Sequence, residues 1–345
     1  MRCSKINYYI FVVVDVLRKL AYPISLVYAL VVYMRNFLYD VGIFKSKSFS
    51  TPTICIGNLS VGGTGKTPMV EFLISNLQND AKVAVLSRGY KRKSKGFVLA
   101  NQDSTVEDLG DEPFQIHSKF SQVIVAVDAD RRNGISNLEK NHSPDFIVLD
   151  DAFQHRKVKP TSSILLTTYS NLYVNDWYLP TGDLRDSKKE ARRANFIVVT
   201  KCPPDLSKED QKAIIDKLQV SKEQEVLFAS IAYDNKIKGL NSAVNLEAFR
   251  NKKVVLITGI ANPKPLVDFL NQKDISFEHL AYKDHHFFTP DELSLFNSKE
   301  IILTTEKDYV RLKGQVENLH YISIKHQFFN DGDKVLIREM KSLLN

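Results

Sequence analysis

Short apolar runs alternate with helical patterns along the chain from residue 53 onward. Six runs are apolar almost throughout and predict strands at 53–56, 83–86, 123–127, 146–149, 164–166 and 196–199. A helix over about 68–77 is predicted after the first of them. Because strands buried on both faces are typical of parallel sheets, the pattern predicts a doubly wound, mostly parallel α/β domain. Such folds bind ligands at the carboxyl ends of the strands.

A second α/β pattern follows in the last third of the chain. Residues 226–240 are expected to form two strands joined at Asp234-Asn235 as a hairpin. Further strands are predicted at 253–259, 301–304 and 321–324. We therefore expect a main domain over 51–225, a two-stranded hinge linker over 226–250, and a smaller C-terminal domain over 251–345.

The first 50 residues form an arm of different character. Apolar runs at 8–14 and 21–34 are separated by Asp15, Arg18 and Lys19, and each is shorter than the roughly 18 residues of a spanning helix. We expect a membrane-associated helix at the bilayer interface, with its tyrosines at headgroup level and its basic residues facing anionic lipid. The tyrosines are Tyr22, Tyr28, Tyr33 and Tyr39, and the basic residues are Arg18, Lys19, Arg35, Lys45 and Lys47. A buried core helix is the alternative.

The charged residues and cysteines indicate which kinds of ligand and compartment to expect. The net charge of +7 comes partly from basic runs at 91–95, 157–159 and 188–193, which are either solvated faces or sites that attract phosphate or anionic lipid. No stacking aromatic motif accompanies them, so nucleic acid is not expected. The three cysteines are far apart, which excludes a disulfide framework and indicates a reducing compartment.

A glycine-rich loop follows the first predicted strand and precedes the first predicted helix. Glycines allow backbone N–H groups to surround phosphate oxygens, while Lys66 reaches the β- and γ-phosphates and Thr67 ligates Mg²⁺. The loop departs from the strict P-loop pattern at its first position, where Ser60 replaces glycine. The expected ATP-binding residues are Ser60, Val61, Gly62, Gly63, Thr64, Gly65, Lys66 and Thr67.

A second metal-binding element is expected at the end of a neighbouring strand. Asp150 and Asp151 follow the apolar run 146–149, as in a Walker B segment; the alternative is an ordinary turn or helix cap. The run 199–203 begins like a guanine-reading loop but has Pro203 in place of the aspartate. The pattern therefore favours ATP over GTP.

Four further segments carry candidate chemistry. Carboxylates at Asp111-Glu112 and histidines at His285-His286 could take or orient the proton of an acceptor hydroxyl. Arg131 and Arg185 could neutralise the charge of a transferring phosphoryl group. Taken singly, each of these is also compatible with a surface turn or an ion pair.

Together these pieces resemble the tetraacyldisaccharide 4′-kinase family of lipid A synthesis over nearly the whole chain. The matching strings are Gly57 to Pro68, Ser87 to Tyr90, Gly110 to Pro113, Asp130-Arg131, Leu149 to His155, Leu179 to Arg185 in part, Gly259 to Pro263, Asp284-His285 and Thr305 to Asp308. Asp186 stands where this family is expected to have glutamate. The order and number of these strings make the resemblance specific.

The resemblance implies a P-loop domain joined by a two-stranded linker to a smaller α/β domain, with a cleft that closes on ATP. It implies transfer of the ATP γ-phosphate to the 4′-hydroxyl of a tetraacyldisaccharide 1-phosphate, at the cytoplasmic face of the inner membrane. Asp111 would be the base and His285 its partner. Asp150 and Asp151 would hold Mg²⁺ with Thr67, and Arg131 and Arg185 would stabilise phosphoryl charge.

Two other functions remain open from the residues alone. A soluble P-loop kinase for a small sugar or nucleoside would use the same loop, with the arm as a core helix. A nucleotide-switched, partner-binding NTPase would favour GTP and a metal-ligating spacing of cysteine and histidine, which this sequence lacks. No feature of the sequence identifies a protein partner.

Overall fold

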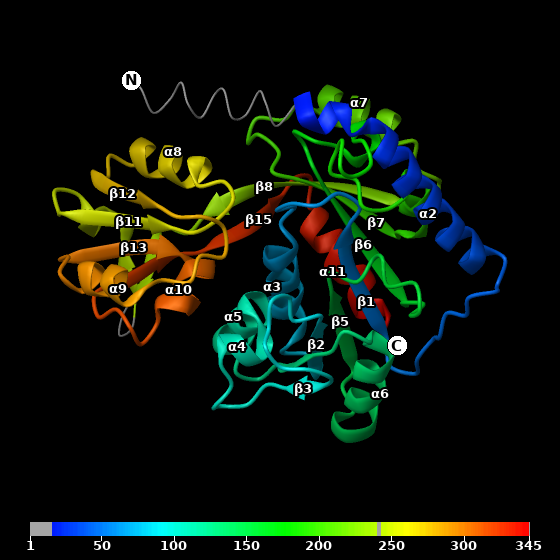
Figure 1. The fold of residues 1–345 in the computed structure, drawn as a ribbon, viewed down its shortest axis with the longest axis horizontal. Helices are drawn as coiled ribbons and strands as arrows, with labels where there is room; N and C mark the ends of the chain where they lie inside the picture. The colour runs from blue at the N-terminus through cyan, green and yellow to red at the C-terminus, as the bar shows by residue number, and fades with distance from the viewer. Residues whose placement is uncertain (1–15, 240–242, 345) are drawn as a thin grey trace.

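The computed structural model describes residues 16–239 and 243–344, and it contains two sheets joined by a narrow ribbon (Figure 1). The larger sheet has nine strands in the order β15-β8-β7-β6-β1-β5-β2-β4-β3. They are β1 (Thr53–Asn58), β2 (Val83–Ser87), β3 (Val98–Leu99), β4 (Ile124–Val127), β5 (Phe146–Asp150), β6 (Ser162–Thr168), β7 (Phe196–Thr200), β8 (Glu225–Tyr233) and β15 (Ile324–Phe328). All neighbours pair in parallel except the two edge strands, β3 and β15. The predicted doubly wound, mostly parallel fold is confirmed.

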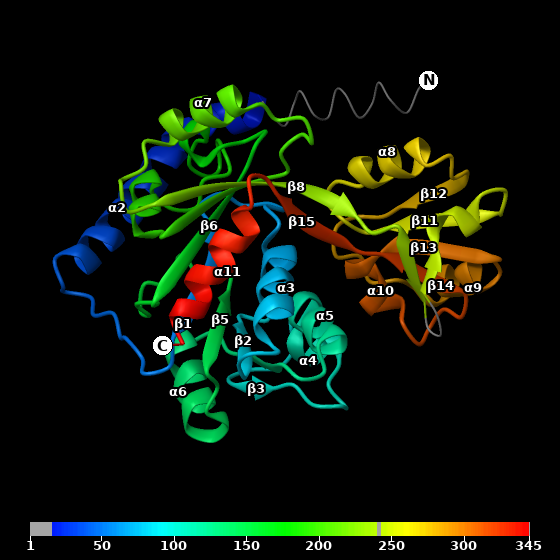
Figure 2. The same cartoon turned by 180° about the vertical axis from the view of Figure 1, so that it is seen from behind.

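Helices cover both faces of this sheet, as Figure 2 shows from behind. They are α2 (Tyr22–Asp40), α3 (Lys66–Leu77), α4 (Val106–Leu109), α5 (Asp111–Lys119), α6 (Arg131–His142), α7 (Lys208–Leu218) and α11 (Gly332–Ser342), with 3-10 turns at Tyr173–Asn175 and Lys188–Arg193. On one face, Leu73 of α3 and Leu336 of α11 belong to a single apolar cluster with β1, β2 and β5. A separate cluster on the other face includes Leu138 of α6 and Phe153.

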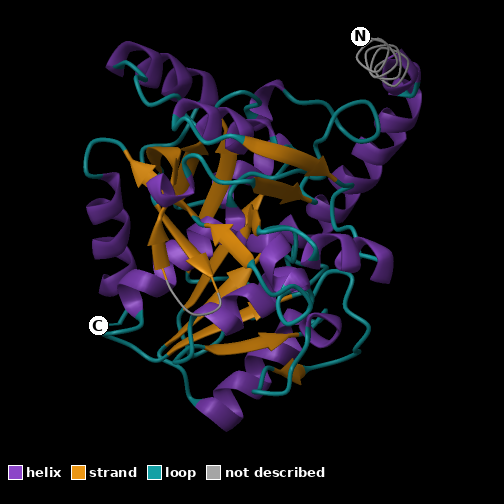
Figure 3. Cartoon of the chain, turned by 90° about the vertical axis from the view of Figure 1, so that its left-hand side faces the viewer, coloured by secondary structure: helices purple, strands orange, loops and turns teal. Residues whose placement is uncertain are grey.

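The smaller sheet has six strands in the order β10-β9-β14-β13-β11-β12. They are β9 (Lys236–Gly239), β10 (Ala243–Asn245), β11 (Val254–Thr258), β12 (Phe277–Ala281), β13 (Ile301–Thr305) and β14 (Leu319–Ile322). Its helices are α8 (Lys264–Gln272), α9 (Pro290–Asn297) and α10 (Glu306–Leu312), with a 3-10 turn at Leu246–Phe249. Figure 3 views the molecule from the side of this smaller sheet.

The expected hairpin over 226–240 is wrong. β8 and β9 lie in different sheets, and the chain passes Asp234 without folding back. The ribbon between the domains instead pairs β8 with β15 in antiparallel register, with Ile324 opposite Tyr233. Asp234 N donates to Ser323 O at 2.9 Å in the same ribbon. Its second strand thus comes from far along the chain, a pairing that a local turn motif cannot predict.

The C-terminal boundary also differs from the expected 251–345. β15 closes the edge of the larger sheet beside β8, and α11 then packs against α3, with Leu336 and Met340 fully buried. The last segment of the chain therefore returns to the first domain. The second domain is an insertion between the two strands of the ribbon.

The helix of the arm has an unusual distribution of side chains. Its buried residues are Ser25, Val32 and Asn36, whereas Ile24, Val27 and Leu30 are 61%, 64% and 60% exposed. The core-helix interpretation is therefore wrong for α2. No helix within the described residues is long and apolar enough to span a bilayer; the apolar run 8–14 lies outside them.

Candidate active site

The phosphate loop connects β1 to α3. Gly62 and Gly65 have φ angles of +112° and +87°, which glycine adopts readily and other residues rarely do. Gly65 directly precedes the first turn of α3, so the unpaired N–H groups of that turn face the loop. The predicted phosphate-binding segment is thus a tight turn at a helix N-terminus. Thr67 lies in that first turn and is partly buried.

Two of the loop amides are already used within the protein. The Val61 N–H donates to Asp183 O at 2.7 Å, and the Thr64 N–H donates to Gly62 O at 3.0 Å. The hydroxyls of Ser60 and Thr64 are buried without a hydrogen-bond partner. Contacts from the Val61 and Thr64 amides to ATP would therefore require these bonds to break.

Lys66 is held at the carboxyl ends of β1 and β5. Its Nζ lies 3.4 Å from Oδ1 of Asn58 and 3.8 Å from Oδ1 of Asp151. The side chain is only 14% exposed. A partly buried ammonium group interacts strongly with a nearby phosphate because little water screens it.

Asp150 ends β5 with one carboxylate oxygen unpaired. Ser87 Oγ donates to its Oδ2 at 3.1 Å, while Oδ1 is buried without a partner. Burial, with the negative charges of Glu112 and Asp151, raises the pKa of Asp150 to about 7. A buried, unpaired carboxylate oxygen beside a phosphate loop fits a ligand for Mg²⁺. The described residues include no group of three or more His, Cys, Asp or Glu side chains placed to hold a metal ion.

Asp151 is engaged by cations. The guanidinium of Arg185 donates to both of its carboxylate oxygens, and Arg185 Nη2 also donates to Oδ1 of Asn58 at 2.5 Å. Burial alone would raise the pKa of Asp151, but the positive charges of Lys66 and Arg185 outweigh it and lower the pKa. Asn58, Lys66, Asp151 and Arg185 thus form one charged cluster beside the loop.

Arg131 does not belong to this cluster. It is buried at the start of α6, where its Nη1 donates to Asp128 O and its Nη2 to Asp150 O, both at 3.0 Å. The guanidinium therefore supports the backbone at the end of β5. Because Arg131 is only 2% exposed and holds two backbone carbonyls, these contacts favour a structural role over the predicted charge-neutralising one.

Asp111 and His285 meet across the two domains. Asp111 begins α5 in the first domain, His285 lies in the loop after β12 in the second, and His285 Nδ1 is 2.7 Å from Asp111 Oδ2. Lys307 Nζ lies 3.1 Å from His285 Nε2. Because an ammonium group can only donate, Nε2 accepts from Lys307 and Nδ1 carries the proton that is donated to Asp111. The two sequence-predicted residues are thus brought together from opposite sides of the ribbon.

The charge around Asp111 keeps it ionised. Burial would raise its pKa, but the hydrogen bond from His285 and the positive charge of Arg311 outweigh burial, so the pKa of Asp111 is lowered. Arg311 Nε lies 3.7 Å from Asp111 Oδ2. Glu112, the next residue, is close enough to raise the pKa of Asp150. The N-terminal turn of α5, which carries Asp111 and Glu112, therefore lies near the end of β5.

Several residues of the site were missed by sequence reasoning. Arg311 donates to His286 O at 2.7 Å and to Asp308 Oδ1 at 2.5 Å, which fixes the loop that carries His285. His326 of β15 lies 2.9 Å from Gly65 O through Nε2. Arg311 and His326 belong to no local sequence motif. The partner of Arg311, Asp308, is the last residue of the Thr305-Glu306-Lys307-Asp308 string. Asn58 was quoted only as part of the glycine-loop string.

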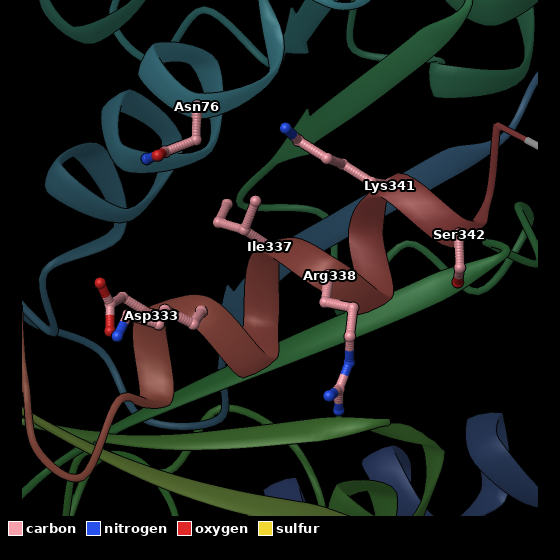
Figure 4. Close-up of a pocket in the computed structure, with 7 residues that line it drawn as sticks. Asn76, Asp333, Ile337, Arg338, Lys341 and Ser342 are labelled. Atoms are coloured by element: carbon pink, nitrogen blue, oxygen red, sulfur yellow. The ribbon is translucent and has the colours of Figure 1, made fainter.

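A surface hollow lies away from these residues. It measures about 610 Å³ and is lined by residues of α3 and α11, including Asn76, Ile337 and Lys341 (Figure 4). None of the predicted site residues contributes to it. The candidate active site is therefore defined by its charged groups and its loop, and not by this hollow.

Comparisons with known proteins agree with this geometry. The sequence profile described as "Tetraacyldisaccharide-1-P 4'-kinase" matches residues 17–344. A protein named tetraacyldisaccharide 4′-kinase from Flavobacterium johnsoniae is 50% identical over 323 residues, which cover 92% of this chain and 94% of that protein. Its namesake from Flavobacterium psychrophilum is 47% identical over 337 residues, covering 94% and 98%.

A solved structure is similar over the same extent. The crystal structure of LpxK from Aquifex aeolicus in complex with ATP superposes with a TM-score of 0.79 at 30% identity, and covers 95% of this chain and 100% of its own. That likeness spans both domains and the ribbon between them. This chain therefore belongs to the tetraacyldisaccharide-1-P 4′-kinase family.

Proposed function

We propose that this kinase transfers the γ-phosphate of ATP to the 4′-hydroxyl of a tetraacyldisaccharide 1-phosphate, with Asp111 as the base. The observation that carries this proposal is the 2.7 Å contact between His285 and Asp111, which joins a carboxylate of the phosphate-loop domain to an imidazole of the other. A carboxylate that stays ionised and is oriented by a histidine is suited to accept a proton from a hydroxyl.

The reaction follows from these groups. The acceptor hydroxyl loses its proton to Asp111 as its oxygen forms a bond to the γ-phosphorus, and the bond from that phosphorus to the oxygen of ADP breaks. His285 donates a hydrogen bond to Asp111 throughout and holds the carboxylate in place. Lys307 keeps the imidazole in the tautomer that donates.

The phosphate side is handled by the loop and its cluster. Lys66 and the first-turn amides of α3 bind the β- and γ-phosphates, and Arg185 compensates charge on the transferring group. Asp150 and Thr67 are the residues that would hold Mg²⁺ when it is bound with ATP, and the ion would supply positive charge that offsets the charge of the phosphates. Asp151 acts mainly by positioning Lys66 and Arg185, because both cations already contact it.

The apolar outer face of α2 is proposed to lie in a lipid bilayer, at the cytoplasmic face of the inner membrane where ATP is available. Large side chains such as Ile24, Val27 and Leu30 are exposed there, while the polar Ser25 and Asn36 face the protein. This is the reverse of a soluble surface helix. A four-chain acceptor leaves the bilayer only at ~0.8 kcal/mol per exposed CH₂, so an enzyme seated at the surface meets it there.

The proposed function is tested with γ-³²P-labelled ATP. The full-length protein in detergent micelles is incubated with tetraacyldisaccharide 1-phosphate or, separately, with free glucosamine. Label is expected in the lipid product and absent from glucosamine. Labelling of glucosamine and not of the lipid would favour the soluble small-molecule kinase instead.

The membrane proposal gives a separate prediction. Replacing Val27 and Leu30 together with serine removes two large exposed side chains, each worth about 1.5–3 kcal/mol when buried in lipid. We expect the fraction of protein that floats with anionic phospholipid vesicles to fall by ~10-fold or more. Flotation equal to that of the wild type would show that this face does not enter the bilayer.

A further inference from the structure

The polar side of α2 contacts a segment that also contacts the phosphate loop. This bridging segment comprises residues 177–186. On one side it is hydrogen-bonded to α2, and on the other it runs along residues 59–61. Figure 1 shows α2 lying along the part of the larger sheet that includes β6 and β7, and β6 pairs with β1.

The contacts from α2 run along the whole bridging segment. Ser25 Oγ donates to Thr181 Oγ1 at 2.8 Å, and Tyr28 OH donates to Arg185 O at 3.0 Å. Asn36 Nδ2 donates to Asp186 Oδ1 at 2.8 Å. Asp186 is fully buried, and Arg35 pairs with its other oxygen at 2.8 Å. A buried carboxylate held by two donors is costly to disturb.

The contacts from the bridging segment to the loop are equally direct. Val61 N donates to Asp183 O at 2.7 Å, and Arg185 N donates to Leu59 O at 2.8 Å. Ser60 and Leu184 form an antiparallel bridge between these two bonds. Each of these bonds lies just before the glycines of the phosphate loop.

Arg185 links the two sets of contacts: its backbone is held by α2 and by residue 59, and its side chain reaches the charged cluster beside the loop. Its carbonyl accepts from Tyr28 and its amide donates to Leu59, while its guanidinium contacts Asn58 and Asp151. The bridging segment is tightly folded on itself, because a Cβ added to Gly182 would lie 2.2 Å from Trp177 O. A shift of α2 is thus transmitted to the Arg185 guanidinium and to residues 59–61.

We propose that Tyr28 and Asn36 of α2 are positioning residues for the nucleotide site, which hold Arg185 and the phosphate loop in place through the bridging segment. The helix that we assign to the membrane face thereby also sets the geometry in which ATP is bound. The positioning role itself does not depend on the identity of the acceptor. It deepens the proposed function by linking membrane contact to the nucleotide site.

The test measures ATP binding apart from turnover. The full-length protein in detergent micelles is titrated with a fluorescent N-methylanthraniloyl ATP and Mg²⁺, and kcat and KM for ATP are measured on the lipid acceptor. Asn36→Leu is expected to lower kcat/KM for ATP by ~10- to 100-fold, as a misplaced charged group does, and to weaken binding of the analogue. Tyr28→Phe, which removes one hydrogen bond, is expected to lower the affinity for the ATP analogue by roughly threefold to tenfold.

Asp40→Asn is the matched control. Asp40 lies at the end of the same helix but pairs with Arg156 at 2.7 Å and does not touch the bridging segment in any described contact. Its ATP kinetics and vesicle flotation are expected to match the wild type. Asn36→Asp places two carboxylates against each other and should weaken binding of the ATP analogue. The double variant Asn36→Asp with Asp186→Asn restores an amide–carboxylate hydrogen bond and should recover most of the affinity for the analogue.

The outcomes separate this inference from the proposed function. Wild-type affinity for the ATP analogue in both Tyr28→Phe and Asn36→Leu would overturn the positioning role. This holds even if Asn36→Leu lowers turnover or vesicle flotation. If Asn36→Leu does not fold, Tyr28→Phe and the double variant still decide the matter. If the wild-type protein binds the analogue but does not label the lipid, the proposed acceptor is overturned. The positioning role is then decided by the affinities of the variants for the analogue alone.

Discussion

Replacing Lys66 with alanine is expected to lower phosphoryl transfer by ~10²–10³-fold. The ammonium group of Lys66 is partly buried between Asn58 and Asp151, so its charge acts on the phosphates with little screening by water. Removing one preorganised donor to a developing charge typically costs ~10²–10³ in kcat. The substitution also leaves Asp151 with one cation fewer. Initial rates with γ-³²P-labelled ATP at saturating acceptor measure the loss.

A matched control uses a lysine outside the site. Lys264 is exposed at the start of α8 and pairs with Asp268 at 2.5 Å; Lys264→Ala should retain wild-type turnover because exposed ion pairs contribute little. Near-normal transfer by Lys66→Ala would mean that the loop does not bind the reacting phosphates. Circular dichroism of both variants checks that each remains folded.

Replacing Asp111 with alanine is expected to lower kcat by ~10²-fold or more, the typical contribution of a general base. KM for ATP should change little, because Asp111 contacts His285 and Arg311 and not the phosphate loop. Asp111→Asn keeps the shape and removes the basic oxygen, so it should lose a comparable factor. Asp103→Asn, an exposed carboxylate in the loop before α4, serves as the control and should behave as the wild type.

The pH profile distinguishes a base from a merely structural carboxylate. In the wild type the pKa of Asp111 is lowered, because the hydrogen bond from His285 and the charge of Arg311 outweigh the effect of burial. The base therefore stays deprotonated as the pH falls toward its ordinary pKa. In His285→Ala the effect of burial is less opposed, the pKa of Asp111 rises, and the acid limb of kcat should move to higher pH. An unmoved acid limb together with full activity in Asp111→Asn would remove Asp111 from the base role.

The proposed base and its histidine partner belong to different domains. Asp111 belongs to the domain that binds ATP, and His285 to the domain inserted between β8 and β15. A second contact lies further along the same junction, where Lys119 of α5 pairs with Glu306 of α10 at 2.8 Å and with Glu71 of α3 at 2.6 Å. Because both contacts cross the junction between the domains, we expect bending of the ribbon to break them together and to remove His285 from the proposed base.

Much of this protein can be predicted from local sequence. The buried parallel strands, the phosphate loop and the two carboxylates after β5 are encoded in contiguous stretches, since strand periodicity, glycine φ angles and a helix N-terminus are local properties. The family strings place Asp111, His285 and Arg185 among the candidates for the same reason. Each is part of a short run whose residues are neighbours in the chain.

Other features depend on pairings between distant residues. The ribbon uses β15 where a hairpin at Asp234 was expected, because β8 pairs with strands on both sides that only the folded sheet supplies. Arg131 follows a strand, as a phosphate-binding arginine could, but folding buries it against carbonyls. The polar residues on the inner face of α2 find their hydrogen-bond partners only in the bridging segment, which is distant from them in the sequence. The contacts of α2 with the bridging segment join residues 150 to 157 positions apart, and the ribbon joins strands from opposite ends of the inserted domain, so no periodicity in the chain specifies them.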